Sequence, residues 1–187
     1  MTESTPMAAT HWKLRMRGDM WREALALHEA GRIRMTEVRA SDYLEDNSIF
    51  SYMLAKPLLA GKRAYVAMPL DVPHSYTAVI DVARTLATVA TDERAYGKFW
   101  HVPTNPPTTV RELATRFTKV HGLPKAKLTE LPYPVLWTAG LFDAMARELR
   151  TTRYQFAKPF ILDSARAEQT FDLAPTDLDT VLKTITA

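Results

Sequence analysis

Side chains that could bind an anion or move a proton lie in three short segments of the sequence. The segments contain Lys13 and Arg17, then Arg39, Ser41, Asp42 and Tyr43, and finally His74 and Tyr76. Lysine acts as a base only where burial lowers its pKa, whereas arginine binds phosphate but donates protons poorly. Each segment also has a structural interpretation: two surface cations one helical turn apart, a turn whose polar side chains satisfy backbone donors, and a buried, hydrogen-bonded histidine.

Several familiar kinds of site are absent from the sequence. It contains no cysteine, which excludes disulfides, thiolate zinc sites and cysteine nucleophiles. Its five histidines are far apart and form no His-Glu-x-x-His motif, so no metal site is predicted. No Gly-x-Ser-x-Gly segment supports a hydrolase. No two of the six glycines have the spacing of a phosphate-binding loop, so the sequence contains no dinucleotide-binding glycine motif.

Helical periodicity predicts most of the elements that must position these segments. An apolar stripe predicts a helix over residues 13–30 that ends at Gly31, and Thr109 with Glu112 forms a capping box for a helix ending near Gly122. Residues 79–94 are predicted to be helical, with Val82, Leu86, Val89 and Ala90 on the apolar side. The other predicted helices are 49–60, 134–149 and two short ones, starting near 163 or 164 and capped by Thr176.

Short β-rich segments alternate with these helices. The predicted strands are residues 32–39, 63–68, 98–102, 126–131 and 159–162. Because strands and helices alternate and helices dominate the second half, the sequence predicts an α/β or α+β architecture. We find no repeat and no clear linker, so residues 1–187 are expected to form a single domain.

Four segments resemble, in order, motifs of the NAD-dependent epimerase/dehydratase family, the extended and atypical short-chain dehydrogenases/reductases. HSYTAVIDVARTLA, residues 74–87, resembles the family's strand that runs into a helix opening with Asp-Val-Ala-x-x-Leu. There Asp81 would complement the dipole of the first helical turn. TESTPM resembles the loop before the catalytic helix. VRASDYL, residues 38–44, and HVPTNPPTTVRELA, residues 101–114, resemble the segments after two successive strands.

The resemblance implies a partial Rossmann-like short-chain dehydrogenase fold, the last strands of the sheet plus a helix-rich substrate-binding subdomain. The chain would be a fragment, the C-terminal, substrate-side half, because the glycine-bearing strands would precede Met1. The complete enzyme would move a hydride between NAD or NADP and a small-molecule hydroxyl or carbonyl substrate. This chain alone is expected to bind the cofactor poorly and to be weakly active or inactive.

The resemblance also implies roles for particular residues. The family's catalytic Tyr-x-x-x-Lys falls on Lys13 and Arg17, so the spacing is kept but the chemistry is replaced. The cofactor-contacting positions fall on Arg39 and Ser41. The substrate-lining positions fall on Asp42, Tyr43, His74 and Tyr76. A literal Tyr-x-x-x-Lys at Tyr52 and Lys56 follows the Arg39 segment, whereas the family motif precedes it, so we interpret it as a chance match.

Charge and composition limit the classes of partner that the chain can be expected to bind. The chain has 24 Lys and Arg against 21 Asp and Glu, a net charge of +3, and its early cations are interleaved with acidic residues. We therefore expect a solvated helix face and no nucleic-acid binding. No apolar segment is long enough for a membrane helix or a secretory signal, so a cytoplasmic protein, with a homodimer possible, is expected. The alternative function is a non-enzymatic small-molecule or protein-binding module, suggested by the replaced catalytic pair.

Overall fold

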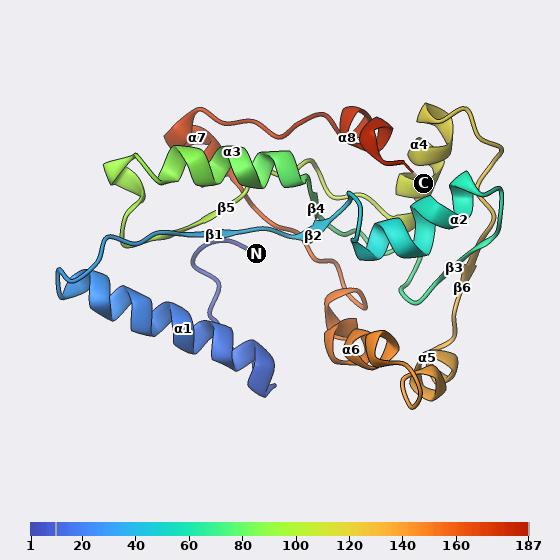
Figure 1. Ribbon diagram of the computed structural model, residues 1–187, viewed down its shortest axis with the longest axis horizontal. Helices are drawn as coiled ribbons and strands as arrows, with labels where there is room; N and C mark the ends of the chain where they lie inside the picture. The colour runs from blue at the N-terminus through green and yellow to red at the C-terminus, as the bar shows by residue number, and fades with distance from the viewer. Residues whose placement is uncertain (10, 187) are drawn as a thin grey trace.

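The computed structural model, which describes residues 1–9 and 11–186, contains three short parallel β-pairs joined and covered by helices (Figure 1). The pairs are β1 (Glu37–Arg39) with β5 (Phe99–His101), β2 (Asp42–Tyr43) with β4 (Tyr76–Thr77), and β3 (Ala64–Val66) with β6 (Leu128–Glu130). Each pair joins strands far apart in the chain, as parallel pairing requires. The predicted mixed α/β class is confirmed.

The first helix, α1 (Trp12–Glu29), ends as its sequence predicts. Gly31 has a φ of +69°, and the Arg32 amide donates to the Leu27 carbonyl at 3.0 Å, which closes the last turn. The other helices are α2 (Lys56–Leu59), α3 (Val79–Val89), α4 (Val110–Val120), α5 (Tyr133–Ala139), α6 (Ala144–Thr152), α7 (Ala165–Phe171) and α8 (Leu178–Thr184). A π-helical turn, Ser51–Ala55, precedes α2, and two 3-10 turns cover Glu93–Ala95 and Arg153–Gln155.

The β1/β5 pair is the middle layer of a small sandwich. Helices α3 and α1 lie on opposite sides of it (Figure 1). On one face, Trp100 and Val38 pack with Val89 of α3 and Phe171 of α7. On the other face, the ring of Trp21 from α1 meets that of Phe99 edge-on, with centroids 5.5 Å apart. Alternating side chains of each strand thus serve two different layers.

A larger core holds the other two pairs together. Helix α4 begins with the predicted capping box, in which the Thr109 hydroxyl accepts from the Glu112 amide at 3.1 Å and the Glu112 carboxylate accepts from the Thr109 amide at 2.9 Å. Its buried side chains Leu113 and Phe117 pack with those of β3, the π-turn and α8. The capping box therefore orients the helix on which this core is built.

Several predicted elements differ from the structure. The strand predicted at 32–39 is confined to β1, because residues 32–36 make no ladder. The helix predicted at 134–149 is broken into α5 and α6, since Gly140 ends the first and Asp143 caps the second by accepting from the Ala146 amide at 2.7 Å. Residues 159–162 form no strand and contribute only a bridge between Phe160 and His74.

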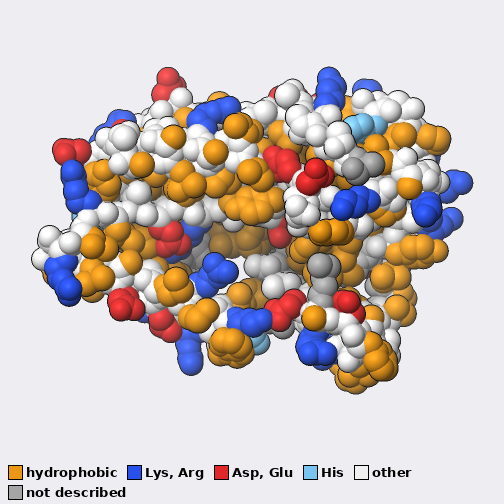
Figure 2. Space-filling view, viewed as in Figure 1, with side chains coloured by type: hydrophobic (Ala, Val, Ile, Leu, Met, Phe, Trp, Pro, Cys, Tyr) orange, Lys and Arg blue, Asp and Glu red, His pale blue; other side chains and the backbone are white. Residues whose placement is uncertain are grey.

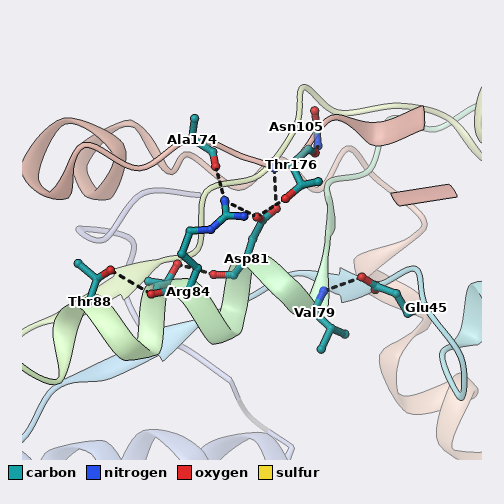
Figure 3. A network of polar contacts seen from close by, with 9 residues as sticks. Glu45, Val79, Asp81, Arg84, Thr88, Asn105, Ala174 and Thr176 are labelled. Atoms are coloured by element: carbon teal, nitrogen blue, oxygen red, sulfur yellow. Dashed lines mark hydrogen bonds and ion pairs between the residues drawn. The ribbon is translucent and has the colours of Figure 1, made fainter. Parts of the chain in front are cut away.

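Helix α3 shows the clearest difference from the prediction, because its buried side is partly polar. Val89 is buried as predicted, but Leu86 is 50% exposed and the buried face carries the polar side chains of Asp81 and Thr85. The reason is a polar network that ties α3 to the C-terminal segment (Figure 3). The Asp81 carboxylate accepts from the Thr176 amide at 2.8 Å and from the Thr176 hydroxyl at 2.6 Å.

That network adds to one prediction and corrects another. Asp81 does stand in the first turn of α3, but its carboxylate binds Thr176 and, at 3.2 Å, the Arg84 guanidinium rather than serving the helix dipole alone. Thr176 does not cap α8; Asp177 does, accepting from the Thr180 amide at 2.9 Å. Asn105 completes the network by donating to the Thr176 carbonyl at 2.7 Å.

Candidate functional site

The structure brings together all four residues assigned to substrate. The β2/β4 register sets Asp42 opposite Tyr76, and the imidazole of His74 donates from Nε2 to Asp42 Oδ2 at 2.7 Å. Tyr43 follows on β2, with its side chain 44% exposed. The sequence missed β2, because SDYLEDNS has the composition of a loop, yet this strand is what aligns Asp42 with Tyr76.

His74 is buried within an aromatic cage. Its ring stacks between Phe156 and Phe160, with centroids 4.8 and 5.0 Å away, and tilts against Tyr76 at 5.1 Å. Its backbone exchanges two hydrogen bonds with Thr108, at 3.0 Å each. No group within the described residues forms a hydrogen bond with the buried Nδ1. Through its contacts with Asp42, Thr108 and Phe160, His74 joins three segments of the chain.

Tyr76 is equally enclosed. Burial, and then the nearby charge of Asp42, raise the pKa of its phenol well above the ordinary value. The apolar pocket beside it, lined by Met53, Val66 and Phe156 among others, has only about 10 Å³ of free space, which is room for one water at most. Tyr76 therefore stays a neutral phenol at ordinary pH, and this pocket is too full for a substrate.

The space for a ligand lies instead between α1 and the β1/β5 pair. A cleft of about 910 Å³ opens there, and Figure 2 shows it as a hollow with basic side chains around it. Its walls come from residues 1–9, α1, the strands β1 and β5, and residues 154–162. Four arginines line it: Arg15, Arg17, Arg22 and Arg39. Of the four substrate-assigned residues, Tyr43 alone reaches this cleft.

The two residues at the family's catalytic positions point to different parts of the structure. Arg17 lines the cleft, and within the described chain its guanidinium forms no hydrogen bond or ion pair. Lys13 instead points to α6, where its Nζ lies 2.6 Å from Glu148 Oε1. This contact lowers the pKa of the Glu148 carboxyl, chiefly through the hydrogen bond. The Lys13 side chain is 44% exposed and paired with a carboxylate, so it lacks the burial that a lysine base requires.

The two residues assigned to cofactor also differ. Arg39 faces the cleft: its Nε donates to Glu37 at 2.7 Å, and its guanidinium lies 3.5 Å from the Phe99 ring centroid. Ser41 is buried, its hydroxyl donates to the Ser75 carbonyl, and its amide donates to Thr77 Oγ1 at 3.0 Å. Ser41 thus has a structural role in joining β1 to the β4 segment. Arg39, in contrast, lines the cleft and can contact a ligand there.

Sequence reasoning missed His101, which ends β5 and lines the cleft. A histidine in KFWHV gives no motif, and only its place at the end of a predicted strand could have suggested it. No metal site accompanies it, because the described residues contain no group of three His, Asp or Glu side chains suited to a cation. None of the described helices is long and apolar enough to cross a membrane.

The residues present do not fit the pyrophosphate of a dinucleotide. Gly31, Gly61, Gly97 and Gly122 have positive φ values, but each stands alone at a turn. The glycine beside the cleft, Gly18, lies inside α1, where backbone amides donate within the helix and are not available to a phosphate. The chain thus offers cations and a surface, but not the backbone approach that such a cofactor uses.

Comparison with known proteins gives a likeness of fold. The chain is similar to UDP-glucuronic acid 4-epimerase from Bacillus cereus, solved with NAD, at a TM-score of 0.68 and 13% identity over 98% of this chain and 52% of that one. dTDP-glucose 4,6-dehydratase from Streptomyces venezuelae, also solved with NAD, gives 0.69 and 15% over 98% and 53%. A nucleoside-diphosphate-sugar epimerase from Staphylococcus aureus gives 0.68 and 18% over 97% and 62%.

These structures confirm, at the level of the fold, the family resemblance predicted from the sequence. The chain spans about half the length of the epimerase and the dehydratase solved with NAD. No family model matches the sequence, and no curated protein matches it.

Proposed function

We propose that the chain is the substrate-binding half of an oxidoreductase of the epimerase/dehydratase type, acting on a small hydroxyl or carbonyl compound. One observation carries the proposal: the cleft runs along β1 and β5 and includes their carboxyl-terminal residues, Arg39 and His101. Ligands of open α/β folds bind at the carboxyl ends of parallel strands. The arginines that line this cleft favour a substrate with an anionic group.

The residues of the cleft would bind and orient that substrate. Arg15 and Arg17 offer guanidinium groups without described partners, Tyr43 and Tyr154 offer aromatic walls, and Glu37 fixes Arg39. Because neither Lys13 nor Arg17 can act as a phenolic acid, the proton transfer that accompanies hydride chemistry would fall to another group. NAD or NADP would be held by a glycine-bearing half and would supply the hydride transfer.

A chimera tests this proposal. The glycine-bearing first half of the Streptomyces dTDP-glucose 4,6-dehydratase would be fused before this chain, with Lys13→Tyr and Arg17→Lys restoring the family pair. We expect the chimera to bind NAD, and the double substitution to raise turnover of a hydroxyl or keto substrate by roughly a hundredfold or more. NAD binding without any turnover in the restored chimera would contradict an oxidoreductase role.

A second candidate, the non-enzymatic binding module, is favoured by the Lys13–Glu148 contact. That ion pair joins α1 to α6 and gives Lys13 a structural use that a catalytic phenol would not have. If the restored chimera is inactive while the unmodified chain still binds a small anion, the binding module is the better description.

The isolated chain also gives a direct prediction. Since it has no glycine cradle, NADH and NADPH fluorescence should show no saturable binding in the micromolar range. Tight binding of either dinucleotide by the unmodified chain would overturn our assignment of the cofactor to another region.

A further inference from the structure

Helices α5 and α6 form a hairpin with one packed side and one exposed side. On the packed side, Leu136, Ala146 and Leu149 form a small core that contacts Ile49 and Met53. The hairpin lies at the lower edge of the molecule in Figure 1, where Figure 2 shows hydrophobic side chains gathered. The large side chains on the exposed side, each 43–52% exposed, are Tyr133, Val135, Trp137 and Leu141. The core of the hairpin therefore leaves this apolar group uncovered.

Phe142 stands at the apex of the hairpin and is 91% exposed. The amide of Leu141 donates to the Thr138 carbonyl at 3.1 Å, and that of Phe142 donates to the Ala139 carbonyl at 3.0 Å. Asp143 then caps α6. A turn fixed by its backbone thus holds a phenyl ring out into solvent, and contiguous exposed apolar side chains mark a contact with a partner or with a membrane.

Three arginines on α6 and in the turn after it lie beside this apolar group. Arg147, Arg150 and Arg153 follow one another at three-residue spacing, which places them on one side of the helix. The Arg150 guanidinium lies 5.2 Å from the Trp137 ring centroid, and that of Arg153 lies 4.5 Å from the Tyr133 ring centroid. Among residues 1–9 and 11–186, no carboxylate forms an ion pair with any of the three. Their positive charges are therefore available to an anionic partner.

This combination of side chains suits the boundary between lipid and water. Tryptophan and tyrosine favour the level of the headgroups, phenylalanine and leucine the start of the acyl chains, and guanidinium groups bind phosphates. A protein partner would instead need a hollow for Phe142. In a second copy of this chain, the apolar pocket beside Tyr76 has only about 10 Å³ of free space, and the cleft beside α1 is lined by four arginines. An anionic membrane surface therefore matches the hairpin better than either hollow of a second copy.

We propose that the α5–α6 hairpin docks on the surface of an anionic membrane. Leu141 and Phe142 enter the boundary between headgroups and acyl chains, and the three arginines bind lipid phosphates. The contact lies at the membrane surface, so it needs no spanning helix. It is also independent of the proposed function, because no residue from Tyr133 to Arg153 lines the cleft.

The first test measures the apolar contribution by flotation of the full chain with vesicles. One set of vesicles is phosphatidylcholine alone, and the other is an equal mixture of phosphatidylcholine and phosphatidylglycerol. Leu141→Ser/Phe142→Ser should weaken binding to the mixed vesicles by at least roughly tenfold, because two apolar side chains no longer leave water. Val79→Ser/Ile80→Ser is the matched control, since these neighbours on α3 are 49% and 53% exposed, and it should change binding less than roughly twofold.

The second test measures the contribution of charge. The unmodified chain should bind the mixed vesicles at least roughly tenfold more tightly than phosphatidylcholine alone, and added salt should reduce the difference. Arg147→Gln/Arg150→Gln should remove most of that preference. Lys125→Gln/Lys127→Gln removes the same charge from the exposed segment before β6 and should leave the preference in place.

A third measurement needs no change to the hairpin apex. Phospholipids with brominated acyl chains should quench part of the tryptophan emission of the unmodified chain, and Trp137→Phe should lose most of that quenching. The quenching places α5 at the membrane even where a serine variant is poorly folded.

Three results would overturn the proposal. They are no binding to the mixed vesicles, equal losses from the apex variant and its α3 control, and a dimer in sedimentation without vesicles that Phe142→Ser abolishes. The last result would assign the hairpin to a second copy of the chain. Turnover by the restored chimera decides the proposed function separately, so the two can fail independently.

Discussion

At the scale of single residues, the Asp42, His74 and Tyr76 group combines enclosure with charge. Asp42 is partly exposed, but the His74 imidazole and Tyr76 ring behind it are almost fully buried. A carboxylate at the edge of an aromatic cage keeps the neighbouring phenol neutral, because the phenolate would meet both low polarity and a like charge. The group therefore stabilises the fold more readily than it transfers protons.

Tyr76 should make stability fall in strong alkali. Its folded pKa lies above the unfolded value of about 10, so the unfolded chain loses this proton first and stability decreases as pH rises above about 10. Below that pH the contribution is fully present. Tyr76→Phe should flatten the decrease. Urea unfolding from pH 8 to 11 measures it, with exposed Tyr65→Phe as the control for loss of one phenol. Identical slopes for Tyr76→Phe and the unmodified protein would contradict the prediction.

At the scale of elements, α3 is held by polar contacts where its sequence predicts apolar ones. Its side toward solvent carries Val79, Ile80 and Leu86, all about half-exposed, and its buried side carries Asp81 and Thr85. Periodicity found the helix, but it could not tell which side is buried. That side was decided by Thr176, 95 residues away, whose contact with Asp81 has no local signal.

Removal of the Asp81 charge should loosen the C-terminal segment. Asp81→Asn removes the charge and one of the two acceptor oxygens that bind Thr176 and Arg84, and we expect a loss of about 2 to 4 kcal/mol in the free energy of unfolding. Asp179→Asn, which breaks the half-exposed contact with Arg116, should cost less than about 1 kcal/mol. Chemical denaturation of both variants checks the difference, and similar losses would show that the network contributes little.

Two truncations on α3 test its orientation. Val89→Ala removes a buried side chain and should cost about 2 kcal/mol. Leu86→Ala, on the exposed side, should stay within about 0.5 kcal/mol. Urea unfolding midpoints measure both losses. A lower midpoint for Val89→Ala than for Leu86→Ala supports the observed orientation, and the opposite order supports the one predicted from periodicity.

At the scale of the whole molecule, stability should be uneven. Two-stranded pairs are weak by themselves, whereas α4 is enclosed by the largest core. We expect the amides of Leu113 and Phe117 to exchange with solvent at least roughly tenfold more slowly than those of α6. Hydrogen exchange followed by NMR gives this comparison, and uniform protection would show one evenly cooperative unit.

The sequence predicted the larger part of this architecture. The caps at Gly31 and Thr109 and the α/β alternation follow from local signals. The family resemblance assigned Asp42, Tyr43, His74 and Tyr76 to substrate; they lie close together, but only Tyr43 lines the cleft. What could not be predicted depends on distant partners: the burial of Asp81, the contact of Lys13 with Glu148, and the hydrogen bond of His101 Nδ1 with the Asp163 carbonyl. Such contacts leave no periodicity in the chain.

The position of Arg39 over Trp21 gives the molecule its own optical signal. The guanidinium lies 5.4 Å from the indole centroid at the wall of the cleft. An anion that draws Arg39 away would change the electric field across that ring and shift its emission, while the Trp100 indole is on the opposite face of the sheet. Occupancy of the cleft could thus be followed in unlabelled protein, with Trp21→Phe as the silent reference.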